Sequence, residues 1–154
     1  MNYNNIKIII PSYNCTNKLI SVIKRLRANN ITSQIFIVDD NSLVRSKLII
    51  NFIKNKFSNI LVITNNKNLG QGGSIKKAFK IVKKTEDLIC TMDDDGQHNT
   101  KDVKKILSKA NKIHYSNCIV LGSRGLELKQ TPFNSYFGNK VSKFIFFLIT
   151  KKKI

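Results

Sequence analysis

The feature that most constrains the fold is an alternation of short apolar runs with longer amphipathic stretches. The apolar runs lie at residues 6–10, 35–38, 60–64, 88–92 and 118–121. Continuous apolar runs of this length are typical of strands buried on both faces, as in parallel sheets. Strands that alternate with helices over short connections build an α/β domain with right-handed crossovers. We therefore predict an α/β fold, with a mostly parallel sheet flanked by helices.

The stretches between the runs carry apolar residues at helical spacing. After the first run these are Leu19, Val22, Ile23 and Leu26. Basic residues occupy the opposite side of that stretch, as expected for a helix packed against a sheet. Further helices are predicted at 48–57, 74–83 and 102–110, and a Gly-rich loop at 68–73 opens the second of these. A chain of 154 residues with 42% hydrophobic content can bury one good core, so we predict a single domain over residues 1–154.

The charge balance is strongly basic. Twenty-seven Lys and Arg residues face nine Asp and Glu residues, and the formal net charge is +18. Such a surface favours anionic partners. An AT-rich coding sequence, which yields many Lys, Asn and Ile residues, would produce the same balance, so both explanations stay open. Nucleic acid is not a predicted partner, because no nucleic-acid-binding motif is present and an acidic triplet would repel a phosphate backbone.

The cysteines and the N-terminus bear on the compartment. Three Cys residues, at 15, 90 and 118, are too few and too scattered for a disulfide framework or a paired metal site. We expect each to be a small buried hydrophobe. The apolar run that starts at Ile6 is too short for a signal peptide and lacks a small-residue cleavage site. We therefore predict a cytoplasmic protein, with peripheral contact to the cytoplasmic membrane face as an open alternative.

Polar clusters follow the predicted strands at the points where they end. These clusters are 11–14, 39–42, 93–98 and 122–124. In open α/β sheets, ligands bind outside the carboxyl ends of the strands. Four segments from distant parts of the chain are therefore expected to converge on one edge of the sheet.

The most specific cluster is the acidic run Asp93-Asp94-Asp95-Gly96-Gln97-His98. Alternate residues of an extended segment point the same way, so Asp93 and Asp95 are predicted to share a face, with Gln97 following past the turn. Two carboxylates and an amide oxygen suit Mg²⁺ or Mn²⁺. A solvated acidic turn or helix cap is the alternative. The position after an apolar strand, in a chain otherwise short of acid, favours the metal hypothesis.

Other polar residues carry weaker signals. Asp40 could accept hydrogen bonds from a nucleobase, and Ser42 could cap the next helix, although plain helix capping would explain the whole segment. Arg124 could clamp a phosphate, or could be an ordinary surface residue. His98 could orient a substrate beside the acidic run. The loop at 68–73 matches neither a Walker A loop nor a G-x-G-x-x-G fingerprint.

Five motifs in order make the sequence recognisable. They are Pro11-Ser12-Tyr13-Asn14, Val38-Asp39-Asp40-Asn41-Ser42, Asn68-Leu69-Gly70, Asp93-Asp94-Asp95-Gly96-Gln97-His98 and Gly122-Ser123-Arg124. Over residues 6 to 150, the sequence resembles family 2 glycosyltransferases. The resemblance is to the branch of dolichyl- or polyprenyl-phosphate hexosyltransferases, whose acidic motif commonly reads D-A-D-G-Q-H. It implies a GT-A, Rossmann-like fold in which residues 1–154 form the nucleotide-sugar-binding domain.

The resemblance also implies roles for individual residues. The residues implied to bind the nucleotide sugar are Pro11, Tyr13, Asn14, Asp40, Gly70 and Asp93. Asp95 and Gln97 would hold Mg²⁺ or Mn²⁺, and the residues implied in catalysis are Asp93, Asp95 and Arg124. The implied reaction is an inverting displacement from a UDP- or GDP-sugar to a lipid-phosphate or glycan acceptor.

Two departures from the family pattern bear on activity. Cys15 stands where the family usually has Glu, which puts one nucleotide contact in doubt. The family also continues past the region of 144–148 into a segment that helps complete the acceptor side, so that side is expected to be missing here. The alternative to an enzyme is a non-catalytic nucleotide-sugar-binding module that needs a partner segment.

The C-terminal residues 133–154 are predicted to form an amphipathic helix. Its apolar side chains include Phe144, Phe147 and Leu148, and its basic end is 151–153. The apolar stretch is shorter than the roughly 20 residues that span a bilayer. Basic residues beside Phe and Leu suit a helix at an anionic membrane surface. Packing on the remainder of a catalytic domain is the open alternative.

Overall fold

The computed structural model describes residues 6–82, 88–110, 112, 120 and 122. The chain separates into two units, Met1–Val120 and Leu121–Ile154, and the architecture given below is that of the first. Its described elements, in chain order, are β1 (Ile6–Ser12), α1 (Asn17–Ala28), β2 (Gln34–Asp39), α2 (Val44–Lys56), β3 (Ile60–Thr64), α3 (Gly70–Val82), β4 (Leu88–Thr91) and α4 (Thr100–Ala110). The predicted strand at 118–121 lies almost entirely outside the described residues, and the predicted helix at 133–154 lies wholly outside them.

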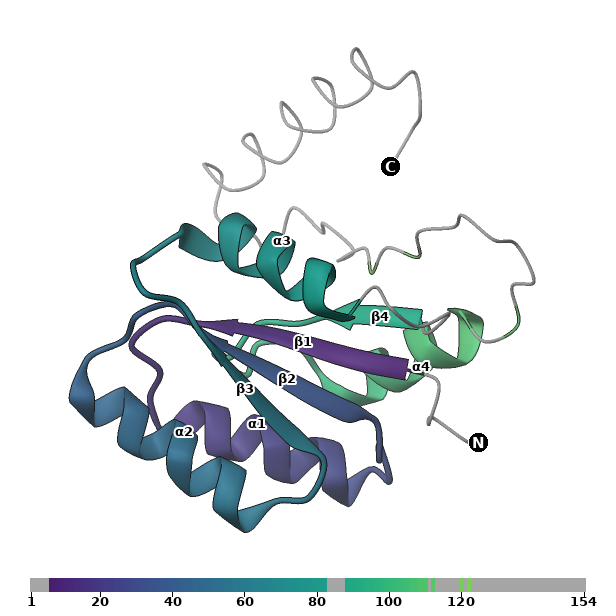
Figure 1. The fold of residues 1–154 in the computed structure, drawn as a ribbon. Helices are drawn as coiled ribbons and strands as arrows, with labels where there is room; N and C mark the ends of the chain where they lie inside the picture. Colours follow the sequence, from purple (N-terminus) through teal and green to yellow (C-terminus); the bar gives the residue numbers. More distant parts are fainter. Residues whose placement is uncertain (1–5, 83–87, 111, 113–119, 121, 123–154) are drawn as a thin grey trace, which may run out of the picture. The chain divides into compact units, whose positions relative to one another are not determined.

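The four described strands form one parallel sheet in the order β3-β2-β1-β4. Helices α1 and α2 cover one face of this sheet, and α3 covers the other (Figure 1). The predicted α/β class and parallel sheet are therefore confirmed. Because all four strands run the same way, their carboxyl ends meet at a single edge.

Strand β1 is buried on both faces over most of its length, which explains why Lys7 is the only charged residue in it. Ile6, Ile8 and Ile10 belong to the core cluster that contains α1, α2 and α4 residues. Ile9 points to the other side, where it packs with residues of β2 and α3. A strand between two helical layers is apolar at most positions, whereas a half-exposed strand would alternate.

Several element boundaries differ from the predicted ones. β1 continues through Pro11 to Ser12, in register with Val38 and Asp39 of β2. Pro11 has no N–H, and it is tolerated here because β4 pairs only with Ile6–Ile9, which leaves one side of β1 unpaired beyond that point. Helix α2 begins at Val44, four residues earlier than predicted.

Helix α3 also begins earlier than predicted, at Gly70 rather than 74. The Gly-rich segment is therefore its first turn and not a loop. The Asn68 side-chain oxygen accepts a hydrogen bond from the Gly70 N–H at 2.9 Å, which satisfies one of the free donors at this helix end. In the described part of the chain, no helix combines the length and hydrophobicity that crossing a bilayer requires.

Arg27 links two connections at the edge opposite to the carboxyl ends. Its guanidinium donates hydrogen bonds to the carbonyl oxygens of Ile31 at 2.6 Å, Ser33 at 3.1 Å and Ser58 at 2.7 Å. The first two carbonyls lie in the connection from α1 to β2, and the third lies between α2 and β3. One side chain therefore fixes how two helices lead into their following strands.

We expect Arg27→Met to lower the free energy of unfolding by about 1–3 kcal/mol, because three carbonyls lose a charged donor. Lys24→Met is the matched control, since Lys24 is exposed on the same helix and should change stability by no more than about 0.5 kcal/mol. Urea unfolding of the two variants makes the comparison. Equal losses would show that Arg27 does not organise the connections.

Candidate functional site

A pocket opens at the carboxyl ends of the parallel strands. Its volume is about 340 Å³, and it is lined by Pro11, Ser12, Tyr13, Asp40, Gln71, Ser74, Asp93, Asp94 and Asp95. These residues come from the ends of β1, β2 and β4 and from the first turns of α3. The predicted convergence of polar clusters at one edge is thus present in the structure for the segments after three of the strands.

Each carboxylate of the acidic triplet is held by a different part of the site. Asp93 accepts a hydrogen bond at Oδ1 from Gln71 Nε2 at 2.8 Å, and its backbone N–H donates to His98 Nδ1 at 3.2 Å. Asp94 Oδ2 accepts from the Ser12 hydroxyl at 2.7 Å. Asp95 Oδ1 accepts from the backbone N–H of Gln97 at 2.8 Å. The triplet therefore bridges β1, α3 and its own turn.

Gly96 allows the turn that follows the triplet. Its φ is +80°, a conformation that side-chain-bearing residues rarely adopt. A Cβ at this position would lie 2.6 Å from Arg25 Nη2. That same guanidinium nitrogen donates to the Gly96 carbonyl at 3.2 Å, so α1 is hydrogen-bonded to the turn.

Asp93 and Asp95 line the same pocket, but not through the two-fold alternation of a strand. β4 ends at Thr91, so the period of a strand does not extend to 93–95, and Asp94 lines the pocket with both neighbours. Met92 still binds the sheet through its N–H to the Ile9 carbonyl at 3.1 Å. Beyond it the chain bends, and all three carboxylates face one cavity.

The triplet is an anionic cluster with no Lys or Arg ion-pair partner among the described residues. Burial raises the pKa of Asp94, and the charges of Asp95 and Asp93 raise it further, while the Ser12 hydroxyl opposes the shift. Among the described residues, His98 alone approaches the triplet as an ion-pair partner, with Nε2 at 3.6 Å from Asp93 Oδ2. The described Lys and Arg side chains, although numerous, leave these carboxylates unneutralised.

The donor chemistry of the triplet fits a hard divalent cation. Carboxylate oxygens are the ligands that Mg²⁺ and Mn²⁺ prefer. In the described residues, however, no group of three or more His, Cys, Asp or Glu side chains forms a ready-made metal cage. A cation here would take some of its ligands from another source, as Mg²⁺ commonly does with the phosphates of a substrate.

Asp40 is buried, with 3% of its surface exposed, and it holds the segment that leads into α3. Its Oδ1 accepts hydrogen bonds from Asn65 Nδ2 at 2.7 Å and from the Leu69 N–H at 2.8 Å. Burial alone would raise the pKa of Asp40, but these bonds, with others from Ser74 and the Gly70 N–H, outweigh it and lower the pKa. Asp40 is thus ionised, and its hydrogen bonds help to hold the pocket wall in place.

Asn14 and Ser42 join two loops at the same edge. Asn14 has a φ of 52°, its N–H donates to Ser42 Oγ at 3.0 Å, and its Oδ1 accepts from the Leu43 N–H at 2.9 Å. The prediction that Ser42 caps the next helix is wrong, because the N-cap of α2 is Leu43 and makes no side-chain capping bond. Ser42 instead connects the loop after β2 to the loop after β1.

The structure brings together some of the residues predicted for the site. Pro11, Tyr13, Asp40, Asp93 and Asp95 all line the pocket. Three predicted residues do not line it: Asn14, Gly70 and Gln97. Arg124 lies outside the described residues. Cys15, the residue in place of the family's usual Glu, is part of the buried core, as expected of a small hydrophobe, and burial raises the pKa of its thiol.

Four lining residues were not singled out in the sequence: Ser12, Gln71, Ser74 and Asp94. Ser12 and Asp94 lie inside motifs that were recognised, so their position there was the available signal. Gln71 and Ser74 follow the Gly-rich segment, and they reach the pocket only because that segment is helical.

Comparison with known proteins agrees with this geometry. The family model for glycosyl transferase family 2 matches residues 7–152. The chain belongs to glycosyl transferase family 2. The parallel sheet flanked by helices is the arrangement expected for the GT-A fold of this family.

Several relatives of this family 2 chain are named for sugar transfer to lipid phosphates. A UDP-N-acetylglucosamine–dolichyl-phosphate N-acetylglucosaminyltransferase of Methanococcus voltae is 30% identical, over 94% of this chain and 62% of the relative. A dolichyl-phosphate beta-glucosyltransferase of Trichomonas vaginalis is 24% identical, over 88% and 44%. An undecaprenyl-phosphate 4-deoxy-4-formamido-L-arabinose transferase of Salmonella paratyphi A is 28% identical, over 95% and 43%. The chain spans less than two thirds of the length of each.

The raised pKa of Asp94 predicts how stability depends on pH when no divalent cation is present. A carboxyl with a raised pKa destabilises the fold once it ionises, so this cost is absent below the ordinary pKa of 3.8 and is fully present above the raised value. Asp94→Asn should therefore be more stable than the unaltered protein at pH 7, and the difference should shrink as the pH falls toward 3.8.

Urea unfolding with a chelator, at a series of pH values, measures this difference. Asp102→Asn is the control, because Asp102 is exposed on α4 and pairs with Lys105. The control should gain no stability at pH 7. A gain of the same size in both variants, or one that does not vary with pH, would show that the cost does not come from the ionised Asp94 carboxylate.

Proposed function

We propose that the protein is a divalent-metal-dependent, inverting glycosyltransferase that moves a sugar from a nucleoside-diphosphate sugar to a lipid-phosphate acceptor. The observation that carries this proposal is the pocket at the carboxyl edge of the sheet, into which three carboxylates project without a Lys or Arg partner in the described residues. Such a pocket suits a diphosphate only when a cation lies between the two sets of negative charge.

The acceptor class rests on the relatives. Their names specify dolichyl phosphate or undecaprenyl phosphate, both of which are long-chain lipid phosphates. The sugars in these names differ, and we therefore leave the sugar of this protein unassigned.

The nucleoside end of the donor is proposed to occupy the side of the pocket formed by Pro11, Tyr13 and Asp40. Tyr13 is 56% exposed at this rim, so its ring is free to pack against a base or ribose. Asp40 is ionised, and its remaining acceptor capacity can receive an N–H of the base. Gln71 and Ser74 present polar groups from α3 on the neighbouring wall.

The diphosphate end is proposed to face the acidic triplet. Asp95 and Gln97 are the proposed metal ligands, with Asp93 beside the ribose and diphosphate. Asp95 uses only Oδ1 for the turn, and its Oδ2 has no hydrogen-bond partner among the described residues. A bound Mg²⁺ or Mn²⁺ would supply Lewis-acid stabilisation of the leaving diphosphate. Gln71 keeps the Asp93 carboxylate oriented through its 2.8 Å hydrogen bond, and Arg124 is proposed to act near the transferred sugar.

Titration calorimetry of the full chain with UDP and with GDP tests the metal-dependent donor site. One of the two nucleotides should bind with Mg²⁺ or Mn²⁺ present and lose its binding after chelation. Asp95→Ala should remove the metal-dependent part, whereas Asp102→Ala, an exposed α4 carboxylate outside the pocket, should retain it. Equal affinity with and without the cation would refute the metal role. Nucleotide binding without sugar transfer would favour the non-catalytic module.

Two substitutions separate the recognition role of Asp40 from its structural role. Asp40→Asn keeps an oxygen that can accept from Asn65 and Leu69, so the fold should survive while nucleotide binding weakens by about 1–3 kcal/mol. Asp40→Ala should weaken binding and also lower the free energy of unfolding, because two buried donors lose their acceptor. Calorimetry and urea unfolding measure both quantities. Unchanged nucleotide affinity in Asp40→Asn would remove Asp40 from base recognition.

A further inference from the structure

The outer face of α2 carries large apolar side chains that no described residue covers. Val44, Leu48 and Phe52 are 73%, 65% and 50% exposed, and they recur at a spacing of four residues. Residues four apart lie on one side of a helix, so the three form a single stripe along α2. Leu43, the residue just before α2, is also exposed. The opposite side of α2 packs on the core through Ser46, Ile50 and Ile53.

Basic residues flank this stripe on both sides. At 100° per residue, Arg45 and Lys56 lie on one side of the stripe and Lys47 and Lys54 on the other. All four are exposed, and α2 contains no acidic residue. None of them forms an ion pair within the described residues. An apolar stripe between two basic rows is the pattern of helices that lie at anionic membrane surfaces.

The stripe begins at the edge of the sheet where the pocket opens. The Leu43 N–H donates to Asn14 Oδ1, which ties the start of α2 to the loop that follows Pro11, Ser12 and Tyr13 of the pocket wall. From there α2 runs beside α1 on the same face of the sheet (Figure 1). A surface that covers the stripe therefore passes the edge at which the pocket opens.

We propose that this stripe and its four basic neighbours dock the protein on an anionic membrane. The choice of a membrane over a protein partner rests on the charge complementarity of the basic rows and on the lipid-phosphate acceptor of the proposed function. The apolar side chains enter the boundary of headgroups and acyl chains, and the basic side chains contact anionic headgroups. The docked helix keeps the site within reach of an acceptor whose phosphate lies at the membrane surface.

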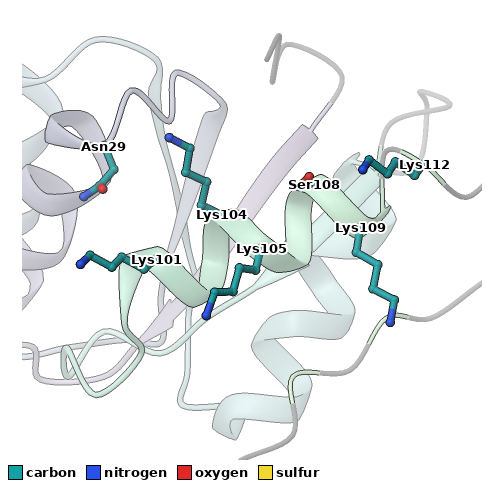
Figure 2. A pocket seen from close by; sticks show the side chains of 7 residues that line it. All are labelled: Asn29, Lys101, Lys104, Lys105, Ser108, Lys109 and Lys112. Atoms are coloured by element: carbon teal, nitrogen blue, oxygen red, sulfur yellow. The ribbon is translucent and has the colours of Figure 1, made fainter.

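The second strongly basic surface, on α4, supplies a matched control. Lys101, Lys104, Lys105, Lys109 and Lys112, with Asn29 and Ser108, line a hollow of about 700 Å³ (Figure 2). The helix buries its apolar residues, Val103 and Leu107, in the core. This surface therefore has charge but no exposed apolar stripe, and changing four of its lysines alters the net charge as much as changing the four basic residues of α2.

Vesicle flotation of the full chain tests the proposal, with phosphatidylcholine vesicles compared with vesicles that also contain phosphatidylglycerol. The unaltered chain should bind the anionic vesicles, and added salt should weaken this binding. One variant removes the stripe by Val44→Ser, Leu48→Ser and Phe52→Ser. A second removes the charge by Arg45→Gln, Lys47→Gln, Lys54→Gln and Lys56→Gln. Each should reduce partitioning by at least about tenfold.

The α4 variant Lys101→Gln, Lys104→Gln, Lys105→Gln and Lys109→Gln should stay within about twofold of the unaltered chain, because screened charges act over roughly a Debye length. Circular dichroism confirms that each variant is folded.

Three outcomes would contradict the proposal. Equal losses of vesicle binding in the α2 and α4 charge variants would show an effect of net charge only. Binding that survives both α2 variants but is lost when Lys151, Lys152 and Lys153 become Gln would place the contact at the C-terminus. A dimer in light scattering that the stripe variant abolishes would show that a second copy covers α2.

Nucleotide calorimetry on the same variants keeps the two proposals distinguishable. The α2 substitutions lie outside the pocket lining, so donor binding should persist in them. Vesicle binding without any nucleotide binding in the unaltered chain would refute the donor site and leave the docking surface standing. Nucleotide binding without vesicle binding would refute the docking surface and leave the donor site standing.

Discussion

The architecture depends on the burial of β1 between two helical layers. Ile8 and Ile10 pack into the α1, α2 and α4 side, and Ile9 packs into the α3 side. Here the neighbouring strands run parallel, and the helices that connect them cross over the two faces and cover them. That arrangement places the polar ends of β1, β2 and β4 at one edge. The pocket is thus a consequence of how the core is filled.

At that edge, carboxylates gather, and no described Lys or Arg residue forms an ion pair with the acidic triplet. Four of its nine acidic residues line one pocket: the triplet and Asp40, which is buried. The two kinds of carboxylate are held differently. Asp40 is stabilised in its ionised form by hydrogen bonds from the segment before α3, whereas Asp94 is destabilised in its ionised form by burial and by its neighbours. The first stabilises the pocket wall, and the second is a carboxylate whose charge the proposed cation would offset.

The positive charge of the protein is correspondingly displaced to outer surfaces. On α4 the lysines surround a hollow, and the apolar residues of that helix are buried. On α2 the basic residues flank apolar side chains that remain exposed. The basic residues of the two helices therefore have different surroundings: those of α2 lie beside exposed apolar side chains, and those of α4 do not. Of these two described surfaces, the α2 face has both exposed apolar side chains and flanking basic residues, the pattern of helices that lie at anionic membrane surfaces.

The apolar runs and the helical stretches between them were enough to predict the parallel α/β fold, because strands buried on both faces are apolar at most positions. The motif order by itself determined the family, and the acidic run marked the edge where the site lies. Tertiary structure decided which side chains share the pocket. Asp94 joins Asp93 and Asp95 because β4 ends at Thr91, a boundary set by its pairing with Ile9. Gln71 and Ser74 reach the pocket because the Gly-rich segment is wound into α3, and Asn14 is held out of the lining by its bonds to the loop after β2.

The sequence alone also did not show that Val44, Leu48 and Phe52 are exposed. Apolar residues lie on both sides of α2, and only its packing on the core shows which of them are left uncovered.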